Sequence, residues 1–423
     1  MQYLFQRSKP SAQLQLFEST TCCGSSAMPD RGHPWPEVNL REIGEISAGG
    51  TPSRDDPSLW NGAVPWLTPG DLTKNPRTVT TESAEHITKA GLNRSAAVLM
   101  PAGALLVTTR ATLGARTIAG VPMATNQGFK NVIFNSTLAE SRFYFHLFGR
   151  LTQEMIRRAS GTTFLEISGK EFGEIVVPLP PLSEQRKIAE ILDAMDQQIS
   201  DSRSVLAKVK KMQAAIGDQF LPWRGNFDCP AGWNFRRLSD LVEMPICYGI
   251  IQVGPHAPDG VPVVMIRDLG SGFQGEFHRV SPVLDSSYAR SRIKGGDLLL
   301  SIKGTIGKVA VTPASFTGNI SRDVARLRLS GMVIPEFLEW LFRTPYGKFL
   351  LDRSVVGTTR AEVSISVLND MEIPIPPLEE QQRIVRVEAS VNAQLVAECA
   401  NLDKVMLARE ALAEDLLTGK VRV

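Results

Sequence analysis

Apolar residues recur at alternating steps of four and three along two long stretches of the chain. The first stretch runs from Ile188 to Phe220 and the second from Ile384 to Leu416. A heptad pattern sustained over several repeats is typical of a coiled coil. We therefore predict two helices, each of about 39 residues and roughly 58 Å long. The apolar seam comprises Ile188, Leu192, Met195, Ile199, Leu206, Val209 and Ile216 in the first helix, and Ile384, Val391, Leu395, Leu402, Val405, Leu412 and Leu416 in the second.

Three charged residues interrupt the seam of the second stretch. Glu388, Glu398 and Arg409 occupy seam positions, where a buried charge without a partner is strongly unfavourable. With such a seam, either the two helices pair with part of the seam open to solvent, or another protein contacts the charged residues. Each helix could instead pack on its own globular domain, but the same register at the end of two units favours pairing of the helices with each other. We expect the second helix to stop near Gly419.

The second half of the chain repeats the first. Residues 178–188 read Pro-Leu-Pro-Pro-Leu-Ser-Glu-Gln-Arg-Lys-Ile, and residues 374–384 read Pro-Ile-Pro-Pro-Leu-Glu-Glu-Gln-Gln-Arg-Ile. Trp35 and Trp233, Arg110 and Lys303, and the turns at 161–163 and 357–359 also match in order and spacing. The prolines fix φ and disfavour helix in the preceding residue, so each connector should be extended before its helix begins. The sequence thus predicts two globular units, each followed by the same connector and helix.

Each globular unit combines short β-like segments with helical patches. In the first unit the β-like segments are 98–109, 116–118 and 131–134, and the helical patch is 138–159. In the second unit they are 297–302, 308–312 and 324–329, with a helical patch at 335–353. Glycine and proline punctuate these segments. We predict an α+β protein with two similar mixed α/β domains and a pseudo-two-fold duplication.

Composition excludes several classes of protein. The chain carries 46 Lys and Arg against 44 Asp and Glu, so its net charge of +2 says nothing about a nucleic-acid partner. No stretch is apolar enough for a membrane span, and the N-terminus lacks the apolar core of a signal peptide. The five cysteines are odd in number and none forms a Cys-x-x-Cys pair. We read them as free thiols, and we expect a cytoplasmic protein without a structural metal or a membrane partner.

The motifs of common catalytic sites are absent from the sequence. The five histidines do not match between the halves, and none forms a His-Glu-x-x-His helix face. Residues 304–308 evoke a phosphate loop but lack its full spacing, so a turn between strands is the favoured interpretation. Neither a Glu-x-Lys nuclease signature nor the Asn/Asp-Pro-Pro-Tyr/Phe signature of amino-methyltransferases occurs. We predict no catalytic residue, no cofactor and no metal in this chain, so that any catalysis belongs to a partner.

Basic and small polar residues gather instead in glycine-rich turns. Arg and Lys read guanine edges or phosphates, Gln reads adenine, and Thr meets phosphates or thymine methyl groups. For any single residue, an ordinary role on the protein surface is favoured over DNA contact. The pair Arg110 and Lys303 supports DNA contact better than the other candidates do, because the two residues match between the halves. The candidate DNA-binding residues are Arg54, Lys74, Arg77, Arg110, Thr112, Gln127, Lys130, Thr162, Thr163, Arg267, Lys303, Thr305, Arg322, Thr358, Thr359 and Arg360. Lys130, after Asn126-Gln127-Gly128, is matched loosely with Arg322.

With its duplicated units, paired Pro-Pro-Leu-x-Glu-Gln connectors and a Leu-Leu-Thr-Gly-Lys-Val-Arg-Val ending, the sequence resembles the specificity (S) subunits of type I restriction-modification systems. The resemblance extends from Trp35 to Val423 and includes Gly-Gly-Thr-Pro at 49–52 and Trp-Leu-Thr-Pro-Gly-Asp-Leu at 66–72. It implies two target recognition domains, each reading one half of a split, asymmetric site in double-stranded DNA. It also implies two antiparallel conserved helices that fix the spacing and receive two modification (methyltransferase) subunits. S-adenosylmethionine is then bound by those subunits, and ATP-driven translocation and cleavage belong to restriction subunits.

The domain boundaries follow from the repeat and the resemblance. They are an N-terminal extension at 1–33, for which disorder is one interpretation, a first target recognition domain at 34–181 and a first conserved helix at 182–222. A second target recognition domain follows at 223–377, and a second conserved helix with the C-terminal tail at 378–423. Because the repeat begins at Trp35, we interpret Met28 as the true start of the protein. The differing loops of the two halves predict two different half-sites.

Three functions from different classes remain open on the sequence alone. The first is a DNA sequence-recognition subunit without catalysis, in which the helices act as a ruler between two readers on B-DNA, whose turn is about 34 Å. The second is a self-contained nuclease or methyltransferase, which the missing motifs disfavour. The third is a coiled-coil scaffold with no DNA role.

Overall fold

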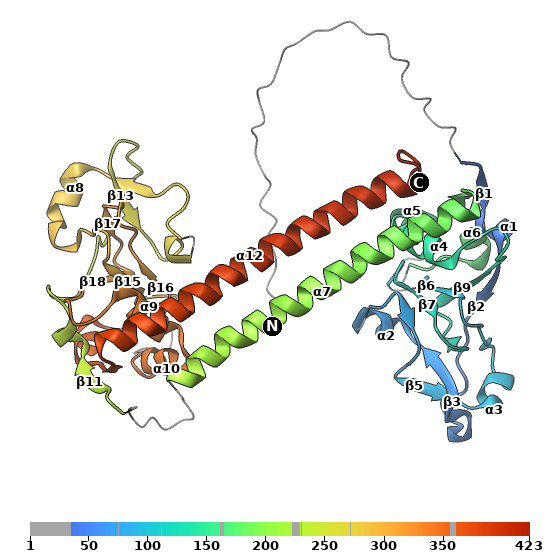
Figure 1. Cartoon of the computed structure of the whole chain (residues 1–423), viewed down its shortest axis with the longest axis horizontal. Coiled ribbons are helices and arrows are strands. Elements are labelled where there is room, and N and C mark those ends of the chain that lie inside the picture. Colours follow the sequence, from blue (N-terminus) through green and yellow to red (C-terminus); the bar gives the residue numbers. More distant parts are fainter. Residues whose placement is uncertain are drawn as a thin grey trace, which may run out of the picture. The chain divides into compact units, whose positions relative to one another are not determined.

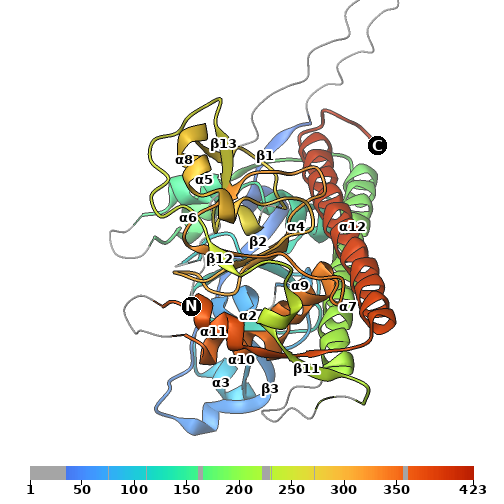
Figure 2. The same cartoon turned by 90° about the vertical axis from the view of Figure 1, so that its left-hand side faces the viewer.

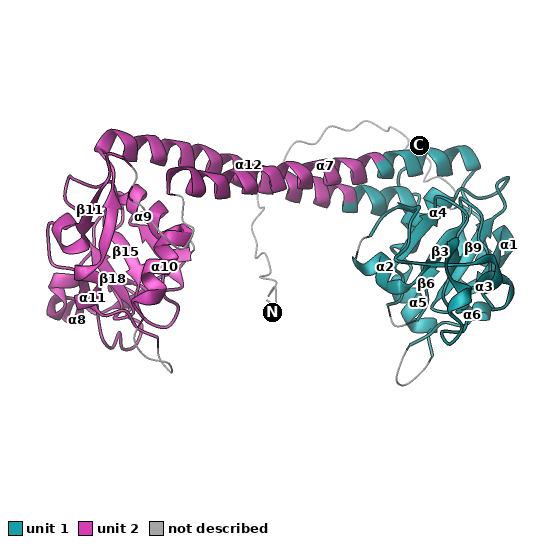
Figure 3. Cartoon of the chain, turned by 90° about the horizontal axis from the view of Figure 1, so that it is seen from below, with its two compact units in different colours: residues 1–193, 410–423 teal, residues 194–409 magenta. Residues whose placement is uncertain are grey.

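A computed structural model describes residues 35–74, 76–110, 112–160, 165–221, 229, 231–270, 272–355 and 361–423 of the chain. These residues divide into two compact units, which Figure 3 shows in different colours. Unit 1 comprises the described residues of 1–193 together with 410–423, and unit 2 those of 194–409. The predicted N-terminal extension and the proposed start at Met28 lie outside the described residues.

Unit 1 is built from a five-stranded sheet in the order β2-β9-β6-β7-β4, a three-stranded sheet β5-β3-β8 and the pair β1-β10 (Figure 1). Its strands are β1 (Glu37–Asn39), β2 (Gly44–Ala48), β3 (Trp60–Leu67), β4 (Val79–Thr80), β5 (Glu85–Ile87), β6 (Leu105–Thr108), β7 (Arg116–Ala119), β8 (Ala124–Thr125), β9 (Phe129–Phe134) and β10 (Val176–Pro178). Its short helices are α1 (Leu40–Ile43), α2 (Pro69–Lys74), α3 (Lys89–Asn93), α4 (Ser141–Phe148), α5 (Thr152–Arg158) and α6 (Gly169–Gly173).

Unit 2 repeats this topology with a four-stranded sheet β12-β18-β15-β16, a three-stranded sheet β14-β13-β17 and the pair β11-β19. Its strands are β11 (Asn234–Arg237), β12 (Cys247–Tyr248), β13 (Val261–Val264), β14 (His278–Val280), β15 (Leu298–Ser301), β16 (Val309–Val311), β17 (Asn319–Ile320), β18 (Val324–Leu327) and β19 (Glu372–Ile375). Its short helices are α8 (Pro282–Ser287), α9 (Pro335–Arg343), α10 (Pro345–Arg353) and α11 (Ile365–Asp370). In both units the three-stranded sheet joins one antiparallel and one parallel pair. The predicted mixed α/β fold is confirmed.

Two long helices follow the two units, as predicted. They are α7 (Leu182–Phe220), of 39 residues, and α12 (Leu378–Leu417), of 40 residues. Near the start of α7, Asp196 accepts two hydrogen bonds from Arg409, near the end of α12. Near the end of α7, the side chain of Gln213 donates to Glu388, near the start of α12. The two helices therefore run antiparallel, and Figures 1 and 2 show them side by side.

The buried face of each long helix falls on the seam positions. Ile188, Leu192 and Val209 are buried in α7, as are Ile384 and Leu416 in α12, and the remaining seam residues are buried or half-buried. In unit 1, Leu416 joins the same apolar core as Ile188 and Leu192. Two of the three charged seam residues, Arg409 and Glu388, meet Asp196 and Gln213 across the helix pair.

A buried glutamine in each connector locks the long helix to its own unit. In unit 1, Gln185 accepts a hydrogen bond from the amide of Glu140 and donates to the carbonyls of Leu138 and Pro180. In unit 2, Gln381 accepts from the amide of Ile334 and donates to the carbonyls of Met332 and Pro376. The glutamine of the duplicated connector thus satisfies the loop that precedes a short helix of the unit, and it also satisfies the carbonyl of the proline two residues before the long helix.

The predicted short elements needed three corrections. The strand expected at 98–109 begins only at Leu105, because residues 101–104 form a turn in which Gly103 has a φ of +91°. The helix expected at 138–159 is two helices, α4 and α5, that break at Gly149. The helix expected at 335–353 breaks at Pro345, whose ring disfavours helix in Thr344. Within the described part of the chain, no helix is long and apolar enough to cross a membrane.

Candidate nucleic-acid interface

Three loops of unit 1 meet beside β8, and glycine makes their approach possible. The loops are 49–53, 68–70 and 126–128, and we call them the unit 1 loop set. The amide of Gly50 donates to the carbonyl of Thr125, and the amide of Asn126 donates to the carbonyl of Leu67. A Cβ on Gly49 would lie 2.0 Å from the carbonyl oxygen of Asn126, so the first loop can reach the third only with glycine there.

Unit 2 repeats these contacts with different side chains. Its loops are 249–253, 265–267 and 321–323, the unit 2 loop set. The amide of Ile250 donates to the carbonyl of Ile320, and the amide of Ser321 donates to the carbonyl of Val264. A Cβ on Gly249 would lie 1.8 Å from the carbonyl oxygen of Ile320. The two loop sets therefore share one backbone frame, and each position of one has a counterpart in the other.

This correspondence corrects one match made from the sequence. Arg322 occupies the place of Gln127, not that of Lys130. Lys130 pairs with Val107 inside a sheet and is only 7% exposed, whereas Arg322 is exposed in a loop. The counterpart of Lys130 is Ala325, because it pairs with Leu300 in the same register. The sequence comparison was off by three residues, because a loose resemblance between loops gives no register.

The side chains of the two loop sets differ in chemistry. In unit 1, the hydroxyl of Thr51 donates to the side-chain oxygen of Gln127 at 2.5 Å, which ties the first loop to the third. In unit 2, Ile251 stands in the place of Thr51, and Arg322 in that of Gln127. A hollow of about 260 Å³ opens there. Arg267 and Arg322 both line it, so two candidate residues from distant segments come together.

The matched cations Arg110 and Lys303 occupy equivalent places, each beside a glutamate. The backbone of Arg110 forms an isolated antiparallel β-bridge with that of Glu166, and the backbone of Lys303 forms one with that of Glu362. Their side chains also pair with these residues, at 3.7 Å for Arg110 and 2.9 Å for Lys303. In the sequence, each glutamate comes shortly after a Gly-Thr-Thr motif, which explains why the sequence showed a match in both segments. Thr112 and Thr305, two residues further on, are exposed in both units.

Arg54 is held by neighbours within unit 1. Its guanidinium donates to both carboxylate oxygens of Glu85, at 2.5 and 2.9 Å, and lies 3.8 Å from the ring centre of Trp60. The hydrogen bond from Arg54 lowers the pKa of the Glu85 carboxyl. An arginine fixed in this way holds the loop 51–59 against β3 and β5. Its contact with DNA stays a prediction.

The remaining candidates fall into two groups. Lys74 and Arg77 are exposed and line a second hollow, of about 270 Å³, in unit 1 together with Asp71 and Glu82. The other group is the two Gly-Thr-Thr turns. Thr162, Thr163, Thr358, Thr359 and Arg360 lie outside the described residues. Within the described part of the chain, no three His, Cys, Asp or Glu side chains lie together as metal ligands would.

Sequence reasoning missed the apolar half of the unit 2 hollow. Ile251, Val253, Met265 and Ile266 line it, and none of them was a candidate, because apolar residues read as core in a single sequence. The contrast of Ile251 with Thr51 was a usable signal, since it places an apolar residue where the other half has a polar one. The contrast can be recognised only when the residues of the two loop sets are aligned, and the backbone hydrogen bonds supply that alignment.

Comparison with known proteins gives consistent matches. Residues 33–211 and 230–393 match the family described as Type I restriction modification DNA specificity domain. The MjaIX specificity subunit of Methanocaldococcus jannaschii is 25% identical over 92% of this chain and 94% of its own. The EcoBI specificity subunit of Escherichia coli is 26% identical over 68% of each chain. The solved S subunit of a type I restriction-modification system from M. genitalium shares the fold, with a TM-score of 0.57 and 11% identity over 92% of this chain and 98% of that one.

Proposed function

The chain belongs to the type I restriction modification DNA specificity family, and on that premise we propose that each of its units reads one half of a split DNA site while its long helices receive methyltransferase subunits. The observation that carries the proposal is the pair of loop sets. One backbone frame occurs twice with different side chains, which is what two readers of unlike half-sites require. A double-stranded DNA with two different half-sites is therefore the inferred ligand.

The long helices support the docking of a partner. On α12, Val396 and Leu407 are 69% and 70% exposed and lie about three turns apart, so they share a face. Exposed alanines at 389, 393 and 400 extend this apolar stripe. An apolar face of this kind that the described residues leave open is typical of an interaction surface. We assign it to a methyltransferase subunit, and we assign ATP-driven cleavage to restriction subunits.

The DNA-reading half of the proposal is tested by the methylome of the source cell. Deleting the gene should abolish methylation at one split motif and leave all other motifs methylated. In binding assays on that motif, Arg110→Ala and Lys303→Ala should each weaken binding by about 1 to 3 kcal/mol, each at one half-site only. Equal weakening on random DNA would mean phosphate contacts, and no motif lost on gene deletion would contradict the proposal.

The same preparation separates the two rival functions. The purified chain with S-adenosylmethionine should transfer no methyl group, whereas the chain with its methyltransferase subunits should. Transfer by the chain alone would identify a self-contained enzyme, and a complex without sequence-specific binding would leave a scaffold. Leu407→Lys should weaken assembly with the methyltransferase, while Gln394→Lys, at an exposed position off the apolar stripe, should leave it unchanged.

A further inference from the structure

We propose that the unit 2 hollow recognises the C5-methyl group of a thymine, through an apolar floor beside a buried serine hydroxyl and two arginines. The inference rests on the proposed function and deepens it, because it names a base that unit 2 reads. In the major groove thymine alone among the bases presents a methyl group next to its O4 acceptor. A reader of thymine therefore needs an apolar contact and a donor side by side.

The apolar contact is present in the unit 2 hollow. Ile251, Val253, Met265 and Ile266 line it, and Ile251 is 48% exposed although it is a large apolar side chain. Such a side chain gains free energy when another apolar group covers it. The described residues of the chain leave about half of it exposed, so a methyl group from outside can cover it.

The donor is Ser321, which also lines the hollow. Its residue is only 6% exposed, and its Oγ has no hydrogen-bond partner among the described residues. A buried hydroxyl without a partner is unfavourable and rare in folded proteins. A hydroxyl hydrogen rotates to suit its acceptor, and the O4 atom of thymine is an acceptor of the right kind.

The rim of the hollow carries two arginines and one aspartate, Asp323. Arg267 and Arg322 line it, and each pairs only weakly with the aspartate that follows it in sequence, at 3.5 and 3.6 Å. Both side chains are at least 49% exposed, so DNA can approach them. Guanidinium groups at this position would contact neighbouring phosphates or a guanine edge and hold the duplex over the apolar floor.

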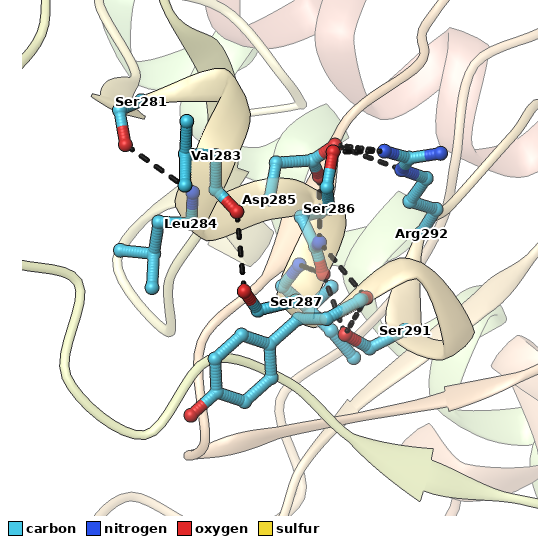
Figure 4. A network of polar contacts seen from close by, with 11 residues as sticks. Ser281, Val283, Leu284, Asp285, Ser286, Ser287, Ser291 and Arg292 are labelled. Carbon is cyan, nitrogen blue, oxygen red and sulfur yellow. Dashed lines mark hydrogen bonds and ion pairs between the residues drawn. The ribbon is translucent and has the colours of Figure 1, made fainter.

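A buried polar network fixes β17, the strand that directly precedes Ser321. Asn319, which is fully buried in β17, donates to Asp285 at 2.8 Å and accepts from Ser291 at 2.7 Å. Asp285 in turn accepts from Arg292 at 2.8 Å. Figure 4 shows Arg292 pointing toward Asp285. A site held this rigidly loses little entropy when it binds, which favours discrimination of one methyl group.

Unit 1 provides the internal contrast. At the equivalent place Thr51 and Gln127 are hydrogen-bonded to each other, and Pro69 and Gly70 replace Ile266 and Arg267. A polar pair closed on itself offers no apolar floor. Methyl recognition of this kind is therefore expected in the half-site of unit 2 and not in that of unit 1.

The experiment replaces thymine by deoxyuridine, which lacks only the methyl group. Each thymine of the methylated split motif is replaced in turn, and binding of the full chain with its methyltransferase subunits is measured. One position in the half-site of unit 2 should lose about fourfold in affinity, or about 0.8 kcal/mol, the value of one buried methyl group. The same replacements in the other half-site should change affinity less than twofold.

Three variants test the residues. Ile251→Ala should reduce the ratio of the affinities for thymine and deoxyuridine from about fourfold towards one, because it removes the apolar contact for the methyl group. Ser321→Ala should weaken binding of both bases alike and keep the ratio, because both carry O4. Val283→Ala, at a 79% exposed position on α8, is the matched control and should change neither value. Unchanged melting temperatures establish that each variant is folded.

Two outcomes would overturn the inference. One is a specific complex that binds thymine and deoxyuridine equally at every position, which leaves the proposed function intact. The other is a wild-type ratio that persists in Ile251→Ala, which moves methyl recognition elsewhere. A complex without any sequence-specific binding would instead contradict the proposed function itself.

Discussion

At the scale of single residues, the buried glutamines of the connectors are held by several hydrogen bonds. Gln185 and Gln381 each make three hydrogen bonds to the backbone and are fully buried. An amide suits this place because it supplies an acceptor and two donors without a charge. The glutamine of the duplicated connector is thus explained by the loop that it satisfies in each unit.

Replacing Gln185 by alanine should destabilise the protein strongly. The change leaves the amide of Glu140 and the carbonyls of Leu138 and Pro180 without partners, so we expect a loss of about 3 kcal/mol, with about 1 kcal/mol for each abandoned group. Urea unfolding measures this loss. Gln197→Ala, at an exposed position of the same helix that bonds only to Asp201, is the control and should stay within about 0.5 kcal/mol of wild type. Equal effects of the two variants would contradict this explanation.

A second residue-scale prediction concerns Glu184, which accepts from Trp35 and from Arg422 in the C-terminal tail. Burial alone would raise the pKa of Glu184, but the hydrogen bonds from Arg422 and Trp35 outweigh it and hold that pKa below its usual value. A carboxyl whose pKa is lowered by folding contributes stability above the unfolded pKa of about 4.3 and loses it as the pH falls through the folded pKa. The contact should therefore stabilise unit 1 fully at pH 7.

Arg422→Ala removes the stronger partner and leaves Glu184 buried. The pKa of Glu184 should then rise relative to wild type, so the variant should be less stable than wild type at pH 7. The difference should shrink as the pH falls towards 5, because Glu184 of the variant takes up its proton at a higher pH than that of wild type. Urea midpoints at the two pH values measure it. A difference that does not depend on pH would mean that Arg422 acts through its packing on Trp35 alone.

At the scale of elements, the register of α7 and α12 is set by polar pairs as well as by the seam. Arg409 with Asp196 and Gln213 with Glu388 each fit in one register only. The apolar seam repeats every heptad and would tolerate a slip, whereas these pairs would be lost in it. Polar residues at seam positions that select a register are a known use of such groups in coiled coils.

Shortening both helices together is expected to change the spacing of the recognised site. Removing one heptad from α7 and the opposed heptad from α12 shortens each by about 10 Å, which corresponds to about three base pairs. The gap in the methylated motif should shrink accordingly, and both half-sites should stay unchanged. Removing a heptad from α7 alone also breaks the register and should reduce stability as well. Methylome sequencing reads the gap, and an unchanged gap would argue against a ruler.

At the scale of the whole molecule, the chain uses one topology twice and varies it in the loops. The sheet orders of the two units correspond strand by strand, apart from the additional β4 of unit 1. Under the proposed function, the differences that bear on DNA lie in the loop sets, where a small polar surface in unit 1 corresponds to a hollow lined by two arginines in unit 2. Specificity can then vary without changing either core.

Grafting therefore tests the division of labour between the units. Replacing residues 250–253, 265–267 and 321–323 with the counterparts 50–53, 68–70 and 126–128 should change one half of the recognised motif and leave the other half and the gap unchanged. The sequence of the methylated motif in a cell that carries the grafted gene measures this. A change in both halves, or none, would contradict independent reading by two units.

The sequence by itself determined the elements whose signal is local or repeated. The heptad of α7 and α12, the proline-rich connectors and the duplication follow from residues near one another in the chain, and the observed helices begin where the prolines end. Tertiary structure alone decided that Arg54 is held by Glu85, that Arg110 and Lys303 stand beside Glu166 and Glu362, and that Ile251 joins Ser321 and Arg267 in one hollow. These partners lie tens of residues apart, and their meeting depends on how strands pair. No local pattern of side chains encodes that pairing, and the structure supplies it through the backbone hydrogen bonds that fix the register.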